Sequence, residues 1–88
     1  MHLTRYLAAE WAPYGITVNT LAPGYLRTTL TQPLWSRPAD LERALRLNVQ
    51  PRFGELHEVV GPLVFLASDA SSYMTGHALM VDGGRAII

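Results

Sequence analysis

The sequence predicts an α/β fold in which two parallel strands are joined by crossover helices. Ile16 to Leu21 is a run of β-forming residues that ends just before Pro23-Gly24. Ala78 to Val81 is a second short apolar run, and it stops at Asp82-Gly83-Gly84. The residues between the two runs have helical periodicity. A strand, a helical crossover and a second strand form a right-handed unit, so the strands are expected to be parallel neighbours.

A first helix is expected before the strands. Apolar side chains recur there at helical spacing: Leu3, Tyr6, Leu7 and Trp11. Pro13 and Gly15 end this helix, because proline disfavours helical geometry in the residue before it and glycine tolerates a left-handed cap. The apolar stripe packs either in the core or against another subunit, and both interpretations stay open.

Two further helices are predicted between the strands. Apolar residues at helical spacing indicate a helix over 39–48 and another over 56–67. Pro62 in the second of these is compatible only with a late first turn or a bend. Residues 28–34 allow no more than a short helical turn. The range 29–53 is therefore expected to form a flap rather than a regular layer.

Composition narrows the class of protein. The chain has 88 residues, of which 49% are apolar, so it is at most one small domain and too apolar to be disordered. Seven basic residues balance seven acidic ones, which argues against a nucleic acid or a membrane surface as partner. No secretory signal and no apolar run of bilayer-spanning length is found, so a cytoplasmic protein is expected.

Metal binding is not expected. The sequence contains no cysteine, which excludes disulfides and thiolate metal sites. His2, His57 and His77 lie far apart in the chain. Only His57 has carboxylates close by, Glu55 and Glu58, and a solvent-exposed helix face is the simpler interpretation of this group.

The candidate functional residues follow the first strand. Ligands of open α/β sheets bind at the carboxyl ends of strands, where this chain turns at Pro23-Gly24. Proline fixes the turn and removes a donor, and glycine lets the backbone approach a neighbouring group closely. The same dipeptide is also compatible with a plain turn at the end of a strand. Asn19, within the strand, is expected to be a buried amide that bonds to the backbone.

Four sequence segments point to a protein family. They are Leu-Thr-Arg-Tyr-Leu-Ala-Ala-Glu-Trp-Ala-Pro-Tyr-Gly-Ile-Thr-Val-Asn at 3–19, Ala-Pro-Gly-Tyr-Leu-Arg-Thr at 22–28, Phe-Leu-Ala-Ser-Asp-Ala-Ser-Ser-Tyr-Met-Thr-Gly at 65–76, and Val-Asp-Gly-Gly at 81–84. In this order they resemble the carboxyl-terminal part of a short-chain dehydrogenase/reductase. Residues 28–34 and Arg52-Phe53-Gly54 are most similar to gluconate 5-dehydrogenase-like members. The resemblance covers the whole chain but only about the last third of a complete member.

The resemblance implies a fold and an activity. Residues 1–88 would be a partial, carboxyl-terminal segment of one dinucleotide-binding domain with a Rossmann-like, doubly wound parallel sheet, and 29–53 would be its substrate flap. The implied enzyme is an NAD(P)-dependent oxidoreductase that interconverts a hydroxyl and a carbonyl group of a small alcohol or ketone, such as the sugar acid gluconate. The complete protein would be a homodimer or homotetramer. The alternative is a non-catalytic remnant that serves as an oligomerisation or partner-binding module.

The resemblance also implies roles for individual residues. Pro23 and Gly24 would shape the loop beneath the nicotinamide of NAD or NADP. The backbone of Leu26 would meet the carboxamide, and the Thr28 hydroxyl would add a hydrogen bond there or to the phosphates. Tyr25 would border the substrate.

Two other features of the chain have competing interpretations. The flap aromatics Trp35 and Phe53 either border the substrate or anchor the flap. The Asp82-Gly83-Gly84 turn is expected to be structural, and by resemblance it lies near a subunit contact.

No catalytic residue is expected within the chain. The family's glycine-rich loop, its catalytic serine and its Tyr-x-x-x-Lys segment would all precede residue 1. The chain also has no lysine, the cation that would lower a catalytic tyrosine's pKa. The isolated chain is therefore expected to be inactive. It is also expected to be poorly soluble or molten, because the first helix would expose the face that meets the missing sheet.

Overall fold

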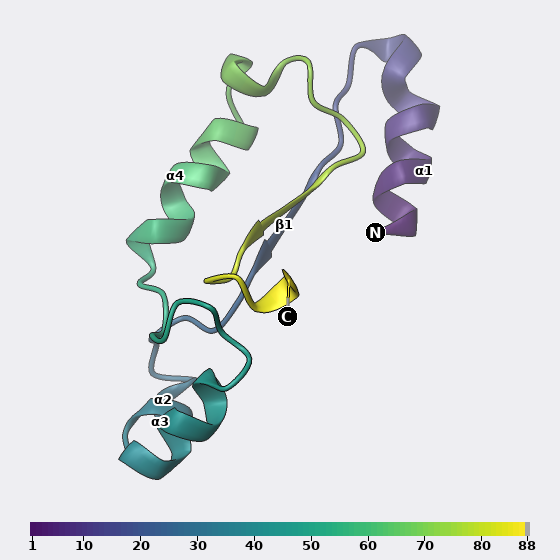
Figure 1. The fold of residues 1–88 in the computed structure, drawn as a ribbon. Coiled ribbons are helices and arrows are strands. Elements are labelled where there is room, and N and C mark those ends of the chain that lie inside the picture. Colours follow the sequence, from purple (N-terminus) through teal and green to yellow (C-terminus); the bar gives the residue numbers. More distant parts are fainter. Residues whose placement is uncertain (88) are drawn as a thin grey trace.

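The computed structural model describes residues 1–87, which form helices around a two-stranded sheet (Figure 1). The elements in chain order are α1 His2–Trp11, η1 Ala12–Tyr14, β1 Thr20–Pro23, α2 Gln32–Trp35, α3 Pro38–Leu45, α4 His57–Leu66, η2 Asp69–Ser71, β2 Ala78–Val81 and η3 Arg85–Ile87. The predicted order of helix, strand, crossover helices and strand is confirmed.

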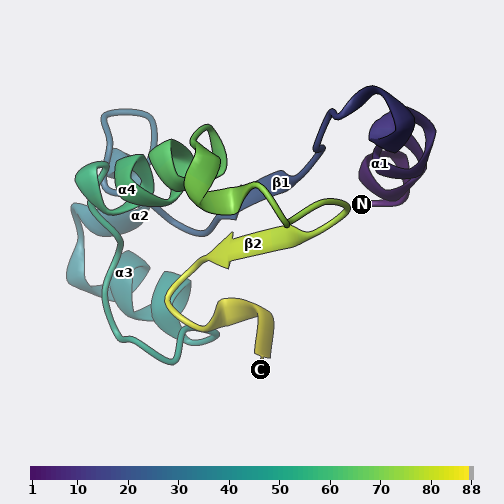
Figure 2. The same ribbon diagram turned by 90° about the horizontal axis from the view of Figure 1, so that it is seen from above.

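The sheet consists of β1 and β2, which lie side by side and run in parallel (Figure 2). Their register pairs Thr20 with Ala78 and continues to Pro23 with Val81. In Figures 1 and 2, α1 and α4 lie on different sides of the strands. The parallel pairing and the bounds of β2 agree with the prediction. β1, by contrast, begins four residues later and ends two residues later than the predicted run from Ile16 to Leu21.

Side chains and a turn replace the strand ladder before β1. The amide nitrogen of Asn19 donates to the carbonyl of Met74 at 3.1 Å, and its oxygen accepts from the amide of His77 at 3.1 Å. The Gly76 amide donates to Val18 at 2.7 Å, and Gly76 has a φ of 74°. The partner segment therefore turns where a longer strand would need it to stay extended. The expected bonding of the Asn19 amide to backbone groups is confirmed, whereas the residue is half-buried rather than buried.

The helices follow the predicted pattern with local differences. Gly15 ends the first helical segment with a φ of 73°, as expected of a left-handed cap. α4 begins at His57, so Pro62 lies in its interior and the idea of a late first turn is wrong. The proline costs α4 one helical hydrogen bond, at the carbonyl of Glu58. No helix within residues 1–87 has the length and apolar character needed to cross a bilayer.

Few side chains are buried in this chain. Among residues 1–87, only Ala8, Phe53 and Ser71 are less than 9% exposed. The radius of gyration is 15.7 Å, whereas a compact chain of this length has about 12 Å. The accessible surface is 6463 Å², against about 5,100 Å² for a compact protein of this mass. The fold therefore leaves apolar faces that the chain does not cover itself.

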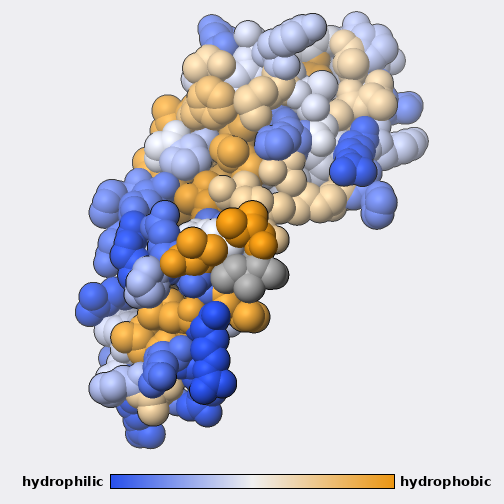
Figure 3. All heavy atoms as spheres, in the orientation of Figure 1, coloured by the Kyte–Doolittle hydropathy of each residue, from blue (hydrophilic) through white to orange (hydrophobic). Residues whose placement is uncertain are grey.

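Both α1 and α4 carry uncovered apolar surface. Apolar atoms gather on the α4 side in the upper part of the molecule, and hydrophilic ones around α2 and α3 (Figure 3). On α4, Leu63 is 53% and Val64 is 59% exposed. On α1, Leu3 is 67% and Tyr6 is 63% exposed. This part of the predicted stripe does not pack in the core of this chain.

We expect the isolated chain to self-associate through these faces. Size-exclusion chromatography with light scattering should show oligomers that bind a hydrophobic dye, because exposed apolar patches of this kind favour association. The double variant Leu63→Glu/Val64→Glu should shift the chain toward monomers. The control Leu30→Glu, at a residue that is 92% exposed outside both helices, should not. A monodisperse wild-type monomer with a sharp thermal transition would contradict this expectation.

Candidate functional site

The candidate site begins where β1 ends. The amide of Gly24 donates to the carbonyl of Val81 at 3.0 Å, which continues the strand pairing by one bond. A Cβ atom built on Gly24 would lie 2.8 Å from the Cα of Asp82. The backbone segments approach too closely there for any side chain. Gly24 is thus required by its contact with the end of β2, a reason that sequence reasoning did not suggest.

The loop after Gly24 is held by a bridge to a distant glycine. The Gly54 amide donates to the carbonyl of Tyr25 at 2.9 Å, and the Arg27 amide donates to the carbonyl of Gly54 at 2.8 Å. In such a parallel bridge the residue between the two bonded groups, Leu26, directs its own amide and carbonyl away from the partner. Within residues 1–87, no acceptor is found for the Leu26 amide. A backbone donor is therefore left unused at the carboxyl edge of the sheet.

Thr31 organises the other side of this loop. Its hydroxyl donates to the carbonyl of Leu26, and it accepts from the Thr28 amide at 3.0 Å. The Thr28 hydroxyl has only long contacts of 3.4 Å, both to Thr31, so it can accept or donate to a ligand. Sequence reasoning missed Thr31. The signal was the Thr-x-x-Thr spacing, which is typical of hydroxyl-stabilised turns.

The flap aromatics have anchoring contacts. The indole nitrogen of Trp35 donates to the carbonyl of Thr28 at 3.2 Å, and the Arg27 guanidinium lies 4.4 Å from the Trp35 ring centroid. Phe53 is 6% exposed and stacks on Tyr25 with ring centroids 5.3 Å apart. Of the two interpretations that the sequence left open, these contacts favour anchoring for both aromatics.

Tyr25 lies between an aromatic ring and a cation. Phe53 covers it as described above, and the Arg85 guanidinium lies 4.4 Å from the Tyr25 ring centroid. Arg85 also donates through Nη1 to the carbonyl of Ala44 at 3.1 Å and to Oδ1 of Asn48 at 3.0 Å. A cation–aromatic contact of this kind contributes about 0.5–1 kcal/mol. Nothing in the sequence pattern pointed to Arg85, because its partners lie about forty residues away.

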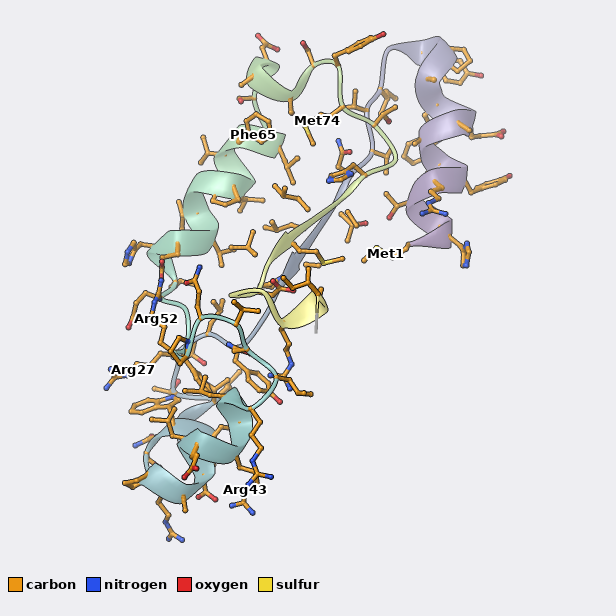
Figure 4. All side chains as sticks on the ribbon, in the orientation of Figure 1. Met1, Arg27, Arg43, Arg52, Phe65 and Met74 are labelled. Carbon is orange, nitrogen blue, oxygen red and sulfur yellow. The ribbon has the colours of Figure 1, made fainter. Side chains whose placement is uncertain are left out.

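An ion pair fixes the segment that carries Gly54. Both terminal nitrogens of Arg52 donate to the Glu58 carboxylate, at 2.7 and 2.9 Å, and the Glu55 amide donates to the same carboxylate at 2.9 Å. The hydrogen bonds from Arg52 and then from Glu55 lower the pKa of Glu58 to about 2, and the same pairing raises the pKa of Arg52. In Figure 4, Arg27 and Arg52 lie on the same side of the molecule. The ion pair therefore holds the Gly54 side of the bridge to Leu26 in place.

The turn after β2 completes the site. The Asp82 carboxylate accepts from the Gly84 amide at 3.0 Å and from the Ala86 amide at 3.0 Å, so the expected structural role of this turn is confirmed. A pocket of about 320 Å³ lies between the loop at Leu26, the segment at Gly54 and this turn. Within residues 1–87, no three metal-binding side chains come together.

The site can therefore hold a ligand through backbone and hydroxyl groups. The Leu26 amide and the Thr28 hydroxyl belong to the loop that follows Gly24 at the carboxyl edge of the sheet, and Tyr25 and Leu26 line the pocket of about 320 Å³. The only tyrosine among them, Tyr25, has no lysine beside it, because the chain has none.

A parallel crossover with a polar loop at the strand ends is the arrangement found in open α/β sheets, whose ligands bind at the carboxyl ends of the strands. The model of the family described as enoyl-(acyl carrier protein) reductase matches residues 1–86. The chain belongs to the short-chain dehydrogenase/reductase family. The expected family and fold are confirmed.

Several relatives are named as dehydrogenases of sugar acids or polyols. The chain is 49% identical over 86 residues to D-arabinitol 2-dehydrogenase (ribulose-forming) of Scheffersomyces stipitis, covering 96% of this chain and 31% of that one. It is 48% identical over 85 residues to galactitol 2-dehydrogenase (L-tagatose-forming) of Cereibacter sphaeroides, covering 97% and 34%. The structure of a gluconate 5-dehydrogenase from Burkholderia cenocepacia with NADP and tartrate matches with a TM-score of 0.88 at 39% identity, covering 99% and 34%. The predicted likeness to gluconate 5-dehydrogenases is confirmed. The chain spans about a third of the length of these relatives.

We expect Gly24→Ala to separate the ends of the two strands. The added Cβ would lie 2.8 Å from Asp82, and overpacking of this kind costs about 1–3 kcal/mol. Hydrogen–deuterium exchange of peptides 20–24 and 78–82 should accelerate accordingly. The control Gly61→Ala lies in α4, where the added Cβ has nothing within 4 Å apart from its own chain neighbours, and it should leave the exchange of both strand peptides unchanged. Unchanged strand exchange in Gly24→Ala would contradict the close approach.

We expect the ion pair to show as a low pKa of Glu58. Because folding lowers this pKa, the pair contributes stability above the ordinary value of 4.5, and that contribution is lost as the pH falls toward 2. NMR titration of the Glu58 carboxyl should give a value near 2, and Arg52→Gln should raise it. Arg37→Gln, which removes an exposed guanidinium outside the pair, is the control. A Glu58 titration that does not respond to Arg52→Gln would refute the pairing.

Proposed function

We propose that this chain supplies the loop that holds the nicotinamide end of NAD or NADP in an oxidoreductase. The observation that carries the proposal is the unused amide of Leu26. The bonds of Gly54 to Tyr25 and Arg27, on either side of Leu26, direct this amide away from Gly54, and no acceptor for it is found among residues 1–87. A carboxamide oxygen is the kind of acceptor that an unpaired amide at a strand's carboxyl edge would bind.

The neighbouring residues suit the same ligand. The Thr28 hydroxyl is two residues from Leu26 and has only long internal contacts. Pro23 presents no backbone donor and is exposed at the end of β1. When bound, the nicotinamide ring supplies hydride transfer to or from a carbon of the substrate. The residues of this chain would orient that ring through the Leu26 amide and the Thr28 hydroxyl, and they would border the substrate through Tyr25.

We further propose a sugar-type substrate, with a hydroxyl and a carbonyl group as the interconverted pair. The names of the relatives support this: D-arabinitol, galactitol and gluconate dehydrogenases. The NADP in the Burkholderia structure supports the cofactor class. The range 29–53, which carries α2 and α3, would be the substrate flap of a dinucleotide-binding domain of which residues 1–88 form a part.

The acid–base chemistry would come from residues outside this chain, because no lysine stands next to any tyrosine here. The 88-residue chain alone would then be inactive. The alternative is a non-catalytic association module, which the exposed apolar faces of α1 and α4 favour. Reading the coding region upstream of Met1 separates the two. A glycine-rich loop and a Tyr-x-x-x-Lys segment there would support the enzyme, and finding neither would support the module.

The cofactor role is tested in a completed enzyme, in which residues 1–88 replace the matching segment of the Burkholderia gluconate 5-dehydrogenase. Thr28→Val should raise the Kd for NADPH about 2- to 12-fold, the value of one hydrogen bond. The Kd is measured from the change in NADPH fluorescence on binding. Thr29→Val, the same change at an exposed neighbour, should leave the Kd unchanged. Equal effects of both variants would argue against the role of Thr28, and tight NADPH binding by the isolated chain would contradict its proposed incompetence.

A further inference from the structure

Arg85 holds a position that the proposed function does not use. It follows the turn after β2, yet its Nη1 reaches Ala44 at the end of α3 and Asn48 beyond it. Its guanidinium also lies over the ring of Tyr25. Three separate parts of the chain thus fix one cation beside the residue proposed to border the substrate.

The Arg85 guanidinium retains hydrogen-bonding capacity. Both of its bonds come from Nη1, which leaves the donors on Nη2 and Nε without a partner among residues 1–87. No carboxylate of the described chain lies within ion-pair distance of it, whereas Arg43 pairs with Asp40 and Arg52 with Glu58. Among residues 1–87, therefore, no carboxylate pairs with the positive charge of Arg85.

Arg85 lines a pocket of about 360 Å³ on the flap side of Tyr25. The other walls come from α2 and α3 and include Pro33, Leu34 and Ala44. The two other charged residues that line it, Arg43 and Asp40, form the ion pair already described. The net charge of the lining is thus +1, and Arg85 carries it. Such a pocket suits a small polar molecule with one anionic group.

We propose that Arg85 is a specificity-determining residue that binds the carboxylate of a sugar-acid substrate beside Tyr25. This inference rests on the proposed function and names its substrate class. A planar guanidinium with free donors on one edge matches a carboxylate in charge and shape, whereas a neutral polyol offers only hydroxyl groups. Stacking on Tyr25 and bonding to Ala44 and Asn48 hold the guanidinium in place before the substrate arrives.

The test compares gluconate with sorbitol in the completed enzyme. The two molecules differ only in a carboxylate against a primary alcohol. Arg85→Gln should raise the KM for gluconate about 10- to 100-fold and leave the KM, or the inhibition constant, of sorbitol unchanged. Arg85→Lys keeps the charge but not the planar fork, so it should restore part of the gluconate affinity. Arg46→Gln, which removes an exposed cation outside the pocket, is the matched control.

A structural role for Arg85 alone predicts a different result. In that case Arg85→Gln would weaken gluconate and sorbitol equally, or lower kcat for both, and the proposal would be overturned. If the completed enzyme does not fold, a second chimera is used, in which only residues 82–87 of this chain replace the matching residues of the Burkholderia enzyme. Gluconate and sorbitol are then compared in the same way. Because Thr28→Val tests the cofactor role by NADPH binding, that role and the role of Arg85 can fail independently.

Discussion

The bridge between Leu26 and Gly54 is the contact on which the site depends. It joins the loop after β1 to a segment that lies beyond the whole flap, and it does so through two backbone hydrogen bonds. The same geometry that satisfies Tyr25 and Arg27 turns the amide of Leu26 outward. The parallel bridge thus both fixes the loop to Gly54 and leaves the Leu26 amide free of a partner among residues 1–87.

Other contacts serve that bridge from either side. The Arg52–Glu58 ion pair connects the segment at Gly54 to the start of α4, and Asp82 shapes the turn against which Gly24 packs. Arg85 returns from the end of the chain to the flap. Most of these links are polar, several join segments far apart in the sequence, and they order the loop in a chain that buries very little apolar surface. Order at the site does not require a large core of its own.

The division between binding and chemistry has a physical basis. Orienting a flat ring takes fixed donors and close backbone approach, which the Leu26 amide and the Thr28 hydroxyl provide in the proposed complex. Moving a proton takes a base whose pKa is tuned by a neighbouring charge. The apolar faces of α1 and α4 indicate that further protein surface is needed to cover this segment.

The sequence by itself determined the α/β class, the order of the elements, the bounds of β2 and the role of Asn19. Those features depend on local alternation, helical spacing and turn residues, all of which are visible along the chain. Only the tertiary structure decided where β1 begins, why Gly24 must be glycine and that Gly54 and Arg85 belong to the site. Each of these depends on which segments meet: the turn at Gly76, the close pass of Asp82, and partners that in the case of Gly54 and Arg85 lie about thirty to forty residues away. No local pattern specifies such a meeting, because it is settled by packing across the crossover.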